Sequence, residues 1–184
     1  MEKHIPVEYS RIAKLIHWLT AILVLIAFIL GPGGHEDKIY STAHDFDRQL
    51  HETIGLSVLA LVLIRIVWRT FASTPVSPPV VHWMEVTAKV VQVSLYVLLF
   101  AVPLTAITGA WLEGHPLTLL GGFEIAPIFV KSHDVGEIIS EIHTWLGDAI
   151  LWLAGLHAFA ALFHHYILQD NVLKSMLPQW FNKD

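Results

Sequence analysis

Four long apolar runs constrain the fold of this chain more than any other feature of its sequence. They cover residues 12–30, 50–67, 86–111 and 138–168. Each is long enough to cross the roughly 30 Å hydrocarbon core of a membrane as an α-helix. The chain of 184 residues is 54% hydrophobic and only 15% charged, so its helices lack the charged faces of a soluble domain. The sequence predicts an all-α membrane protein in which residues 1–184 form one domain, a bundle of four transmembrane helices.

Basic residues predict how the four spans are oriented. If the spans alternate in direction, eight of the eleven Lys and Arg residues fall on one side, and only Lys38, Arg48 and Lys131 fall on the other. The positive-inside rule then predicts that both chain ends are cytoplasmic. The first run lacks a small-residue cleavage pattern, so we expect it to be retained as a span. The net charge of -5 does not indicate a nucleic-acid partner.

Histidines inside the apolar runs are the main candidates for function. His143 and His157 lie fourteen residues apart, close to four helical turns, so they share a helix face about 21 Å apart along the axis. His51 begins the second run at the depth of His143, and His17 begins the first run at the depth of His157. An imidazole is costly to bury in lipid without a partner. Two histidines from different helices at matching depth are what bis-histidine haem ligation requires, so the sequence predicts two haem sites, His51 with His143 and His17 with His157.

The chain contains no cysteine. This excludes structural disulfides, iron–sulfur ligation by cysteine and covalent attachment of a c-type haem. Any haem is therefore expected to be held non-covalently by the histidines.

Two glycines stand four residues after the histidines of one predicted pair. Gly55 follows His51 and Gly147 follows His143, and residues at i and i+4 share a helix face. One interpretation is that they let a flat porphyrin approach the backbone from opposite helices. The other is helix–helix packing by small residues, which is common in membranes.

Three further polar residues in the runs have two interpretations each. Arg65 lies fourteen residues after His51 and either pairs with haem propionates or snorkels to the membrane surface. His164 lies seven residues after His157 and either hydrogen-bonds a quinone carbonyl or a propionate, or is a neutral interfacial histidine. Asp148 is a lone acid inside the fourth run; it is either functional or faces a polar group of a neighbouring helix.

Three segments that carry these residues resemble the bacterial cytochrome b561 family. They are YSRIAKLIHWL at 9–19, LHETIGLSVLALVLIRIVWR at 50–69 and EIHTWLGDAILWLAGLHAFAALFHHYILQDNVLKSML at 141–177. The resemblance covers nearly the whole chain. It implies a multi-pass protein of the bacterial inner membrane with two b-type haems, ligated by His17, His51, His143 and His157. It also implies electron transfer to ubiquinone on the cytoplasmic side, at a site with His164 and Arg11. One branch of the family is similar to a superoxide oxidase, a superoxide:ubiquinone oxidoreductase.

The outer loops depart from what a superoxide oxidase requires. An anionic substrate is best collected by a positive surface, whereas these loops carry three basic residues and many acidic ones. The acidic residues are Glu36, Asp37, Asp45, Asp47, Glu113, Glu124 and Asp134. The leading hypothesis is therefore an electron carrier between a periplasmic donor, with superoxide as one candidate, and ubiquinone.

Two alternatives remain open from the sequence. The first is a cytochrome b anchor subunit of a membrane dehydrogenase or hydrogenase, which requires a protein redox partner. The second is a non-redox metal transporter that uses histidines to bind zinc or another divalent ion, which predicts metal ligands clustered at one depth.

Overall fold

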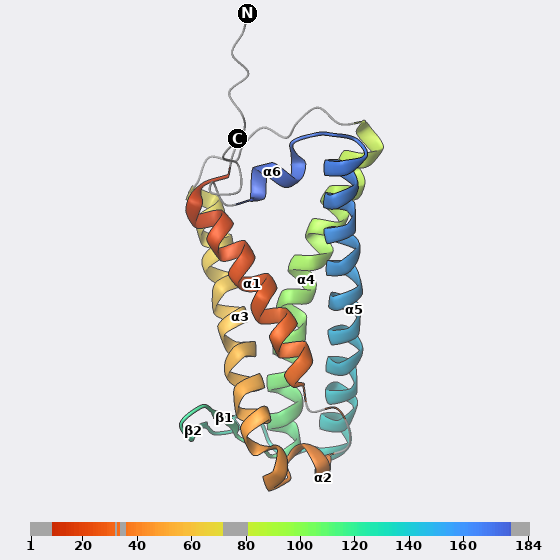
Figure 1. Ribbon diagram of the computed structural model, residues 1–184. Coiled ribbons are helices and arrows are strands. Elements are labelled where there is room, and N and C mark those ends of the chain that lie inside the picture. Colours follow the sequence, from red (N-terminus) through yellow and green to blue (C-terminus); the bar gives the residue numbers. More distant parts are fainter. Residues whose placement is uncertain (1–8, 32, 34–35, 72–80, 178–184) are drawn as a thin grey trace, which may run out of the picture.

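Four long helices make up the bundle shown in Figure 1, a computed structural model that describes residues 9–31, 33, 36–71 and 81–177. The long helices are α1 (Arg11–Leu30), α3 (Asp45–Phe71), α4 (His82–Glu113) and α5 (His133–Tyr166). Each is long and apolar enough to cross a membrane, by length and composition. The predicted bundle of four transmembrane helices is confirmed.

Shorter elements lie at the two ends of the bundle. One end carries α2 (Glu36–Ile39), the 3₁₀-helix η1 (Thr42–His44) and an antiparallel ribbon of β1 (Leu117–Leu119) and β2 (Phe123–Ile125). The other end carries α6 (Val172–Met176). We call these the ribbon end and the α6 end; they are the lower and upper ends of Figure 1.

Local signals set where the long helices begin and end. The hydroxyl of Ser10 accepts a hydrogen bond from the Ala13 amide at 3.2 Å, which caps the start of α1. Asp45 and Asp47 occupy the first turn of α3, where the helix dipole favours negative charge. Gly114, with φ of 89°, ends α4 in the left-handed conformation that glycine adopts easily. The helices α1, α3 and α4 are longer than the apolar runs that they contain. Helix α5 begins five residues before the start of its apolar run and ends two residues before the end of that run.

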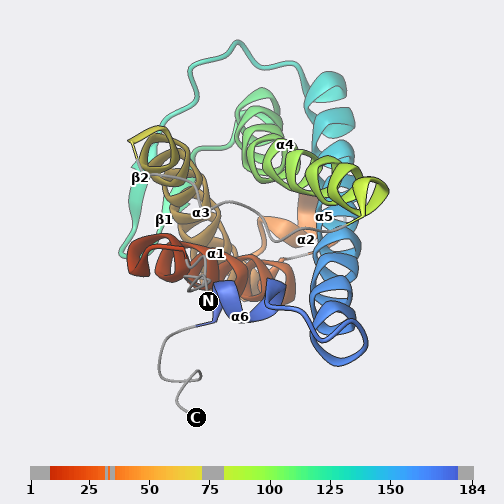
Figure 2. The ribbon, with the colours of Figure 1, turned by 90° about the horizontal axis from the view of Figure 1, so that it is seen from above.

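The helices pack chiefly as two pairs, α1 with α3 and α4 with α5, and Figure 2 shows both pairs from above. A small buried cluster of Ile54, Val58 and Val62 on α3 packs against side chains of α1 and α4. Gly109 lets α4 approach α5 closely, because a Cβ atom added at this glycine would lie 2.5 Å from the Ser140 hydroxyl oxygen. Such close approach through small residues is typical of membrane helices.

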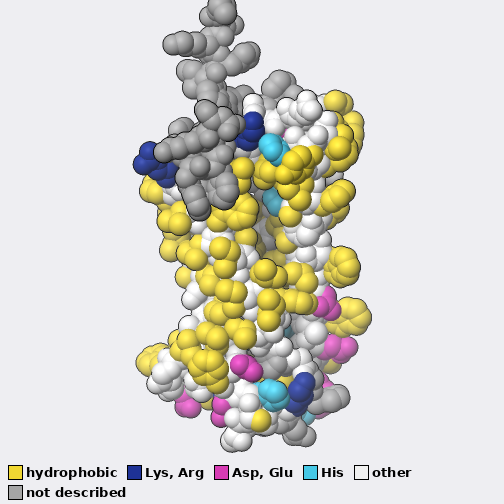
Figure 3. All heavy atoms as spheres, in the orientation of Figure 1, with side chains coloured by type: hydrophobic (Ala, Val, Ile, Leu, Met, Phe, Trp, Pro, Cys, Tyr) yellow, Lys and Arg dark blue, Asp and Glu magenta, His cyan; other side chains and the backbone are white. Residues whose placement is uncertain are grey.

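The outer surface of the bundle suits a lipid bilayer. Hydrophobic side chains cover its length in Figure 3, while charged side chains gather mainly toward the two ends. Among the most exposed residues are Ile29, at 71% relative exposure, and Trp152, at 80%. Exposure of so large an apolar surface to water is unfavourable, whereas its contact with the hydrocarbon of a bilayer is not.

Candidate functional site

The structure brings four histidines of the apolar helices together in two pairs. The imidazole rings of His51 on α3 and His143 on α5 have centroids 6.1 Å apart and planes at 85°. Those of His17 on α1 and His157 on α5 have centroids 6.4 Å apart and planes at 81°. Each pair joins two helices, and α5 contributes one member to each. These are the two pairs that the depth argument predicts.

The spacing within each pair fits a metal ion held between the rings. Two metal–nitrogen bonds of about 2 Å, plus roughly 1 Å from each nitrogen to its ring centre, place two centroids about 6 Å apart. Both observed separations agree with this value. The residues therefore fit a haem iron with one imidazole on each face.

In the ribbon-end pair, the Nδ1 atom of each imidazole makes a hydrogen bond to a backbone carbonyl. Nδ1 of His51 donates to the Ala27 carbonyl at 2.8 Å, and Nδ1 of His143 donates to the Val102 carbonyl at 2.9 Å. Ala27 lies in the last turn of α1, where backbone carbonyls lack helical partners. A carbonyl only accepts, so these bonds place the proton on Nδ1 and leave the Nε2 lone pair free to bind metal.

The α6-end pair has a different environment. Arg65 donates to Nδ1 of His17 at 3.1 Å, and its guanidinium lies 5.6 Å from the centroid of the Tyr96 ring. In this arrangement the neutral His17 ring carries its proton on Nε2. Metal binding through Nε2 therefore requires loss of that proton or movement of Arg65. Neither sequence-based interpretation of Arg65 included this direct contact with a candidate ligand.

The two glycines near the ribbon-end pair do not pack helices together. A Cβ atom added at Gly55 or Gly147 would meet no atom within 4 Å, apart from the nearby backbone of its own helix. Gly109, which does pack against α5, is the opposite case. This open space does not fit the interpretation of helix–helix packing, and the interpretation of room for a porphyrin stays a prediction.

The two residues assigned to quinone binding lie at the α6 end but are not in contact. His164 is half-buried, and its Nδ1 pairs with the carboxylate of Asp170. Asp170 also accepts the backbone N–H of Val172 at 3.0 Å, at the start of α6. Arg11 is exposed in the first turn of α1, and no hydrogen bond joins it to His164 among the described residues.

Sequence reasoning missed several polar residues at the α6 end. Lys14, three residues before His17, is only 4% exposed. The Trp18 indole donates to the Met176 carbonyl at 2.9 Å, which fixes α6 against α1. The position of Lys14, less than one helical turn from a candidate ligand, is the sequence signal that could have identified this residue. The contacts of Trp18 and Asp170 depend on tertiary structure and had no such signal.

A second missed cluster lies at the ribbon end. Arg48 is 8% exposed and donates to Asp45 at 2.9 Å and to Glu52 at 3.0 Å. Its guanidinium also lies 5.2 Å from the centroid of the Tyr40 ring. One of the three basic residues predicted for this side is thus already paired with two carboxylates of the same end.

Comparison with known proteins agrees with the geometry. The chain matches the family model described as prokaryotic cytochrome b561 over residues 8–179. It is 30% identical over 173 residues to cytochrome b561 homolog 2 of Escherichia coli (strain K12), with 94% of this chain and 92% of that protein covered. It is 29% identical over 175 residues to probable superoxide oxidase CybB of Yersinia pestis, covering 94% and 97%. Cytochrome b562 of Cereibacter sphaeroides is 30% identical over 179 residues, covering 92% and 94%.

Four helices that can span a membrane, with histidines paired between helices at two levels, are the features of a membrane cytochrome b. The chain belongs to the prokaryotic cytochrome b561 family, so the resemblance noted in its sequence motifs is confirmed. It is a bacterial membrane protein, and its family implies that it binds b-type haem.

Proposed function

We propose that the chain carries electrons across the membrane, from a donor at the ribbon end to ubiquinone at the α6 end, with two b-type haems. The observation that carries this proposal is the presence of two perpendicular histidine pairs, 6.1 and 6.4 Å between centroids, at two depths. His143 and His157 on α5 are separated by about 21 Å of helical rise. When bound, haem iron supplies one-electron chemistry, and the protein supplies ligands, spacing and a water-poor sheath.

Each candidate residue has a role in this proposal. His51 and His143 ligate one haem, and their Nδ1 bonds to backbone carbonyls orient the rings. Gly55 and Gly147 leave space for the flat macrocycle beside that pair. His17 and His157 ligate the second haem.

Arg65 adds a positive charge beside the second pair. Haem propionates are the natural partners for this guanidinium if it leaves His17 when iron binds.

The quinone site in this proposal lies at the α6 end. Asp170 holds His164 through Nδ1, so the other ring nitrogen can contact a quinone carbonyl. Arg11 and the buried Lys14 make the same end basic. Reduction of a quinone to a quinol takes up two electrons and two protons, and a histidine held by a carboxylate is a suitable group to transfer a proton.

The distribution of charge supports an orientation with the ribbon end in the periplasm. The described basic residues of the bundle ends are concentrated at the α6 end, and the acidic ones at the ribbon end (Figure 3). Lys3 and Lys183, which contribute to the same prediction, lie outside the described residues. We therefore propose an inner-membrane protein with both chain ends in the cytoplasm.

The electron donor is the part of the proposal that the charge of the ribbon end supports least. Superoxide is the donor implied by the family resemblance, and one relative is named a probable superoxide oxidase. An acidic ribbon end repels this anion, and Arg48, one of the few basic residues there, is already paired with Asp45 and Glu52. Superoxide is thus the first donor to test, and a cationic redox protein is the second.

One set of measurements on the purified, haem-loaded protein tests the proposal. We expect two b-type haems per chain and reduction of a ubiquinone analogue when a donor is supplied. A chain that holds fewer than two haems would contradict the two-site proposal.

Co-purification of a soluble partner, with no quinone reduction by the isolated chain, would support the anchor-subunit alternative instead. The zinc-transport alternative lacks a ligand set in the described part of the chain, where no three His, Asp or Glu side chains gather.

A further inference from the structure

A carboxylate lies in the middle of α5, between the two histidine pairs. Asp148 is five residues from His143, about 7 Å of helical rise closer to the membrane centre, and nine residues from His157. Its side chain is exposed on the surface of the bundle. An ionisable group at this depth is rare and costly unless another group meets it, and it is a functional candidate by default.

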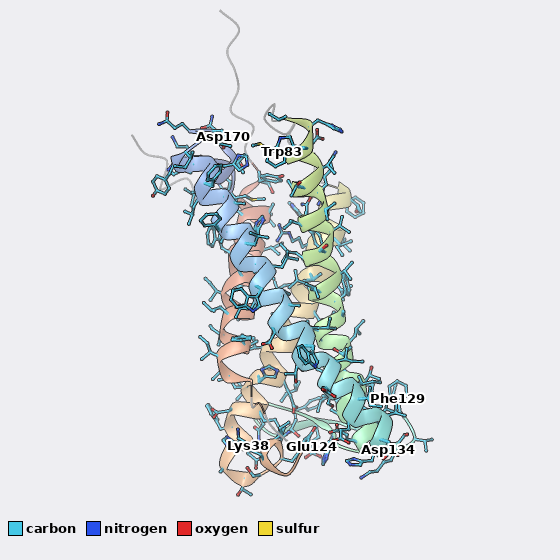
Figure 4. All side chains as sticks on the ribbon, turned by 90° about the vertical axis from the view of Figure 1, so that its right-hand side faces the viewer. Lys38, Trp83, Glu124, Phe129, Asp134 and Asp170 are labelled. Atoms are coloured by element: carbon cyan, nitrogen blue, oxygen red, sulfur yellow. The ribbon has the colours of Figure 1, made fainter. Side chains whose placement is uncertain are left out.

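Asp148 belongs to the face of α5 that points away from the histidine pairs. At about 100° per residue, it lies roughly 140° around the helix from His143 and opposite His157. The α5 back face, as we call it, contains Glu141, Trp145, Asp148, Trp152, Leu156 and Phe159. In Figure 4, α5 runs across the front of the bundle, and no other described helix covers this side.

Two exposed polar groups on the α5 back face lack partners. Trp152 lies one turn from Asp148, and 80% of its surface is exposed. Within the described part of the chain, neither the Asp148 carboxylate nor the Trp152 indole N–H makes a hydrogen bond. The preceding pair on this face differs, because Trp145 donates to Glu141 at 3.4 Å.

We propose that the α5 back face is the interface between two copies of this chain in the membrane. In this dimer the Trp152 indole N–H of each copy donates to the Asp148 carboxylate of the other. The inference does not depend on the donor or on the quinone site.

Two features favour a second copy as the occupant. The face carries a donor and an acceptor one turn apart, so a two-fold axis along the membrane normal satisfies both groups twice. Helical side chains lean toward the N-terminus, which brings Trp152 toward the level of Asp148.

Disulfide cross-linking of the full chain in bacterial membranes tests the proposal, because the natural sequence has no cysteine. Leu156→Cys places one thiol on the α5 back face, at a side chain that is 57% exposed. Val97→Cys on α4 is the matched control, at a side chain that is 60% exposed. Under mild oxidation we expect a cross-linked dimer for Leu156→Cys, at least tenfold more than for Val97→Cys.

Second substitutions test the hydrogen bonds themselves. In the Leu156→Cys background, Asp148→Leu and Trp152→Phe should each lower cross-linking several-fold, while the haem absorbance per chain shows that the protein still folds. Trp152→Phe keeps most of the aromatic surface and removes only the N–H donor.

Three results would overturn the proposal. One is equal cross-linking at residues 156 and 97. Another is no effect of either second substitution. The third is an adduct of Leu156→Cys with a different protein, which would assign this face to another subunit.

Discussion

At the scale of single residues, the glycines of this bundle serve two different purposes. Gly109 lets two helices touch, with a prospective Cβ atom 2.5 Å from the Ser140 oxygen. Gly55 and Gly147 have no atom within 4 Å of the corresponding position, outside their own helix backbone. Sequence alone could not separate these purposes, because both appear as small residues in an apolar helix.

Gly147→Leu is expected to impair the ribbon-end haem site selectively. The leucine side chain would fill space beside His143, so haem content should fall from two per chain toward one. Pyridine haemochrome analysis of the purified variant measures this. Gly155→Leu is the matched control, since Gly155 also has open space around its Cβ position but lies about 120° around α5 from His143. Equal haem loss in both variants would contradict the proposed role of Gly147.

Gly109→Ala is expected to destabilise the bundle rather than one haem. The added methyl group overlaps the Ser140 hydroxyl, and overpacking of this kind costs about 1–3 kcal/mol. Thermal unfolding in detergent should show a lower midpoint, with the haem spectrum unchanged below it. A midpoint equal to that of the unaltered protein would show that α4 and α5 can separate at no cost.

His164→Ala is expected to slow quinone reduction and leave both haem spectra unchanged. Loss of one hydrogen bond worth roughly 1.4 kcal/mol corresponds to about a tenfold effect. Steady-state reduction of a ubiquinone analogue measures it. His165→Ala is the matched control, because that ring contacts Tyr166 instead of Asp170. A rate unchanged by His164→Ala would remove this residue from the proposed quinone site.

At the scale of elements, the sequence predicted the long helices better than the segment that joins α4 to α5. Continuous apolar runs are long enough to require helices in a membrane, so all four were found. The ribbon was not predicted, because each strand has only three residues and depends on contacts with α3. Thr118 donates its backbone N–H to Glu52, and Leu120 donates to the Thr53 hydroxyl at 2.9 Å.

Glu52→Ala is expected to release the ribbon from α3. The change removes the acceptor for Thr118 and leaves Arg48 with only Asp45, and a buried donor left without its acceptor costs about 1–3 kcal/mol. Limited proteolysis should then cleave faster at the turn containing Gly121 and Gly122. Glu124→Ala, an exposed residue of β2, serves as the control and should leave cleavage unchanged. Equal cleavage of the two variants would contradict this role for Glu52.

At the scale of the whole molecule, span direction and helix periodicity together were enough to pair the histidines. Alternating spans bring His51 to the level of His143 and His17 to that of His157. What they could not predict is the asymmetry between the pairs. The acceptors Ala27 and Val102 are backbone carbonyls, which side-chain patterns do not reveal.

The contact between Arg65 and His17 was also beyond the sequence pattern, because it joins residues 48 positions apart. It makes the two ends of the bundle electrostatically different, with neutral acceptors at the ribbon-end pair and a cation at the α6-end pair.

The haem content of His51→Ala, compared with that of the unaltered chain, tests the central claim most directly. Loss of one axial ligand from the ribbon-end pair should reduce the content from two b-type haems per chain to one, and His143→Ala should remove the same haem. The haem that remains should keep its reduced spectrum, because His17 and His157 are unchanged. Two haems with unaltered spectra in both variants would contradict the assignment of this pair.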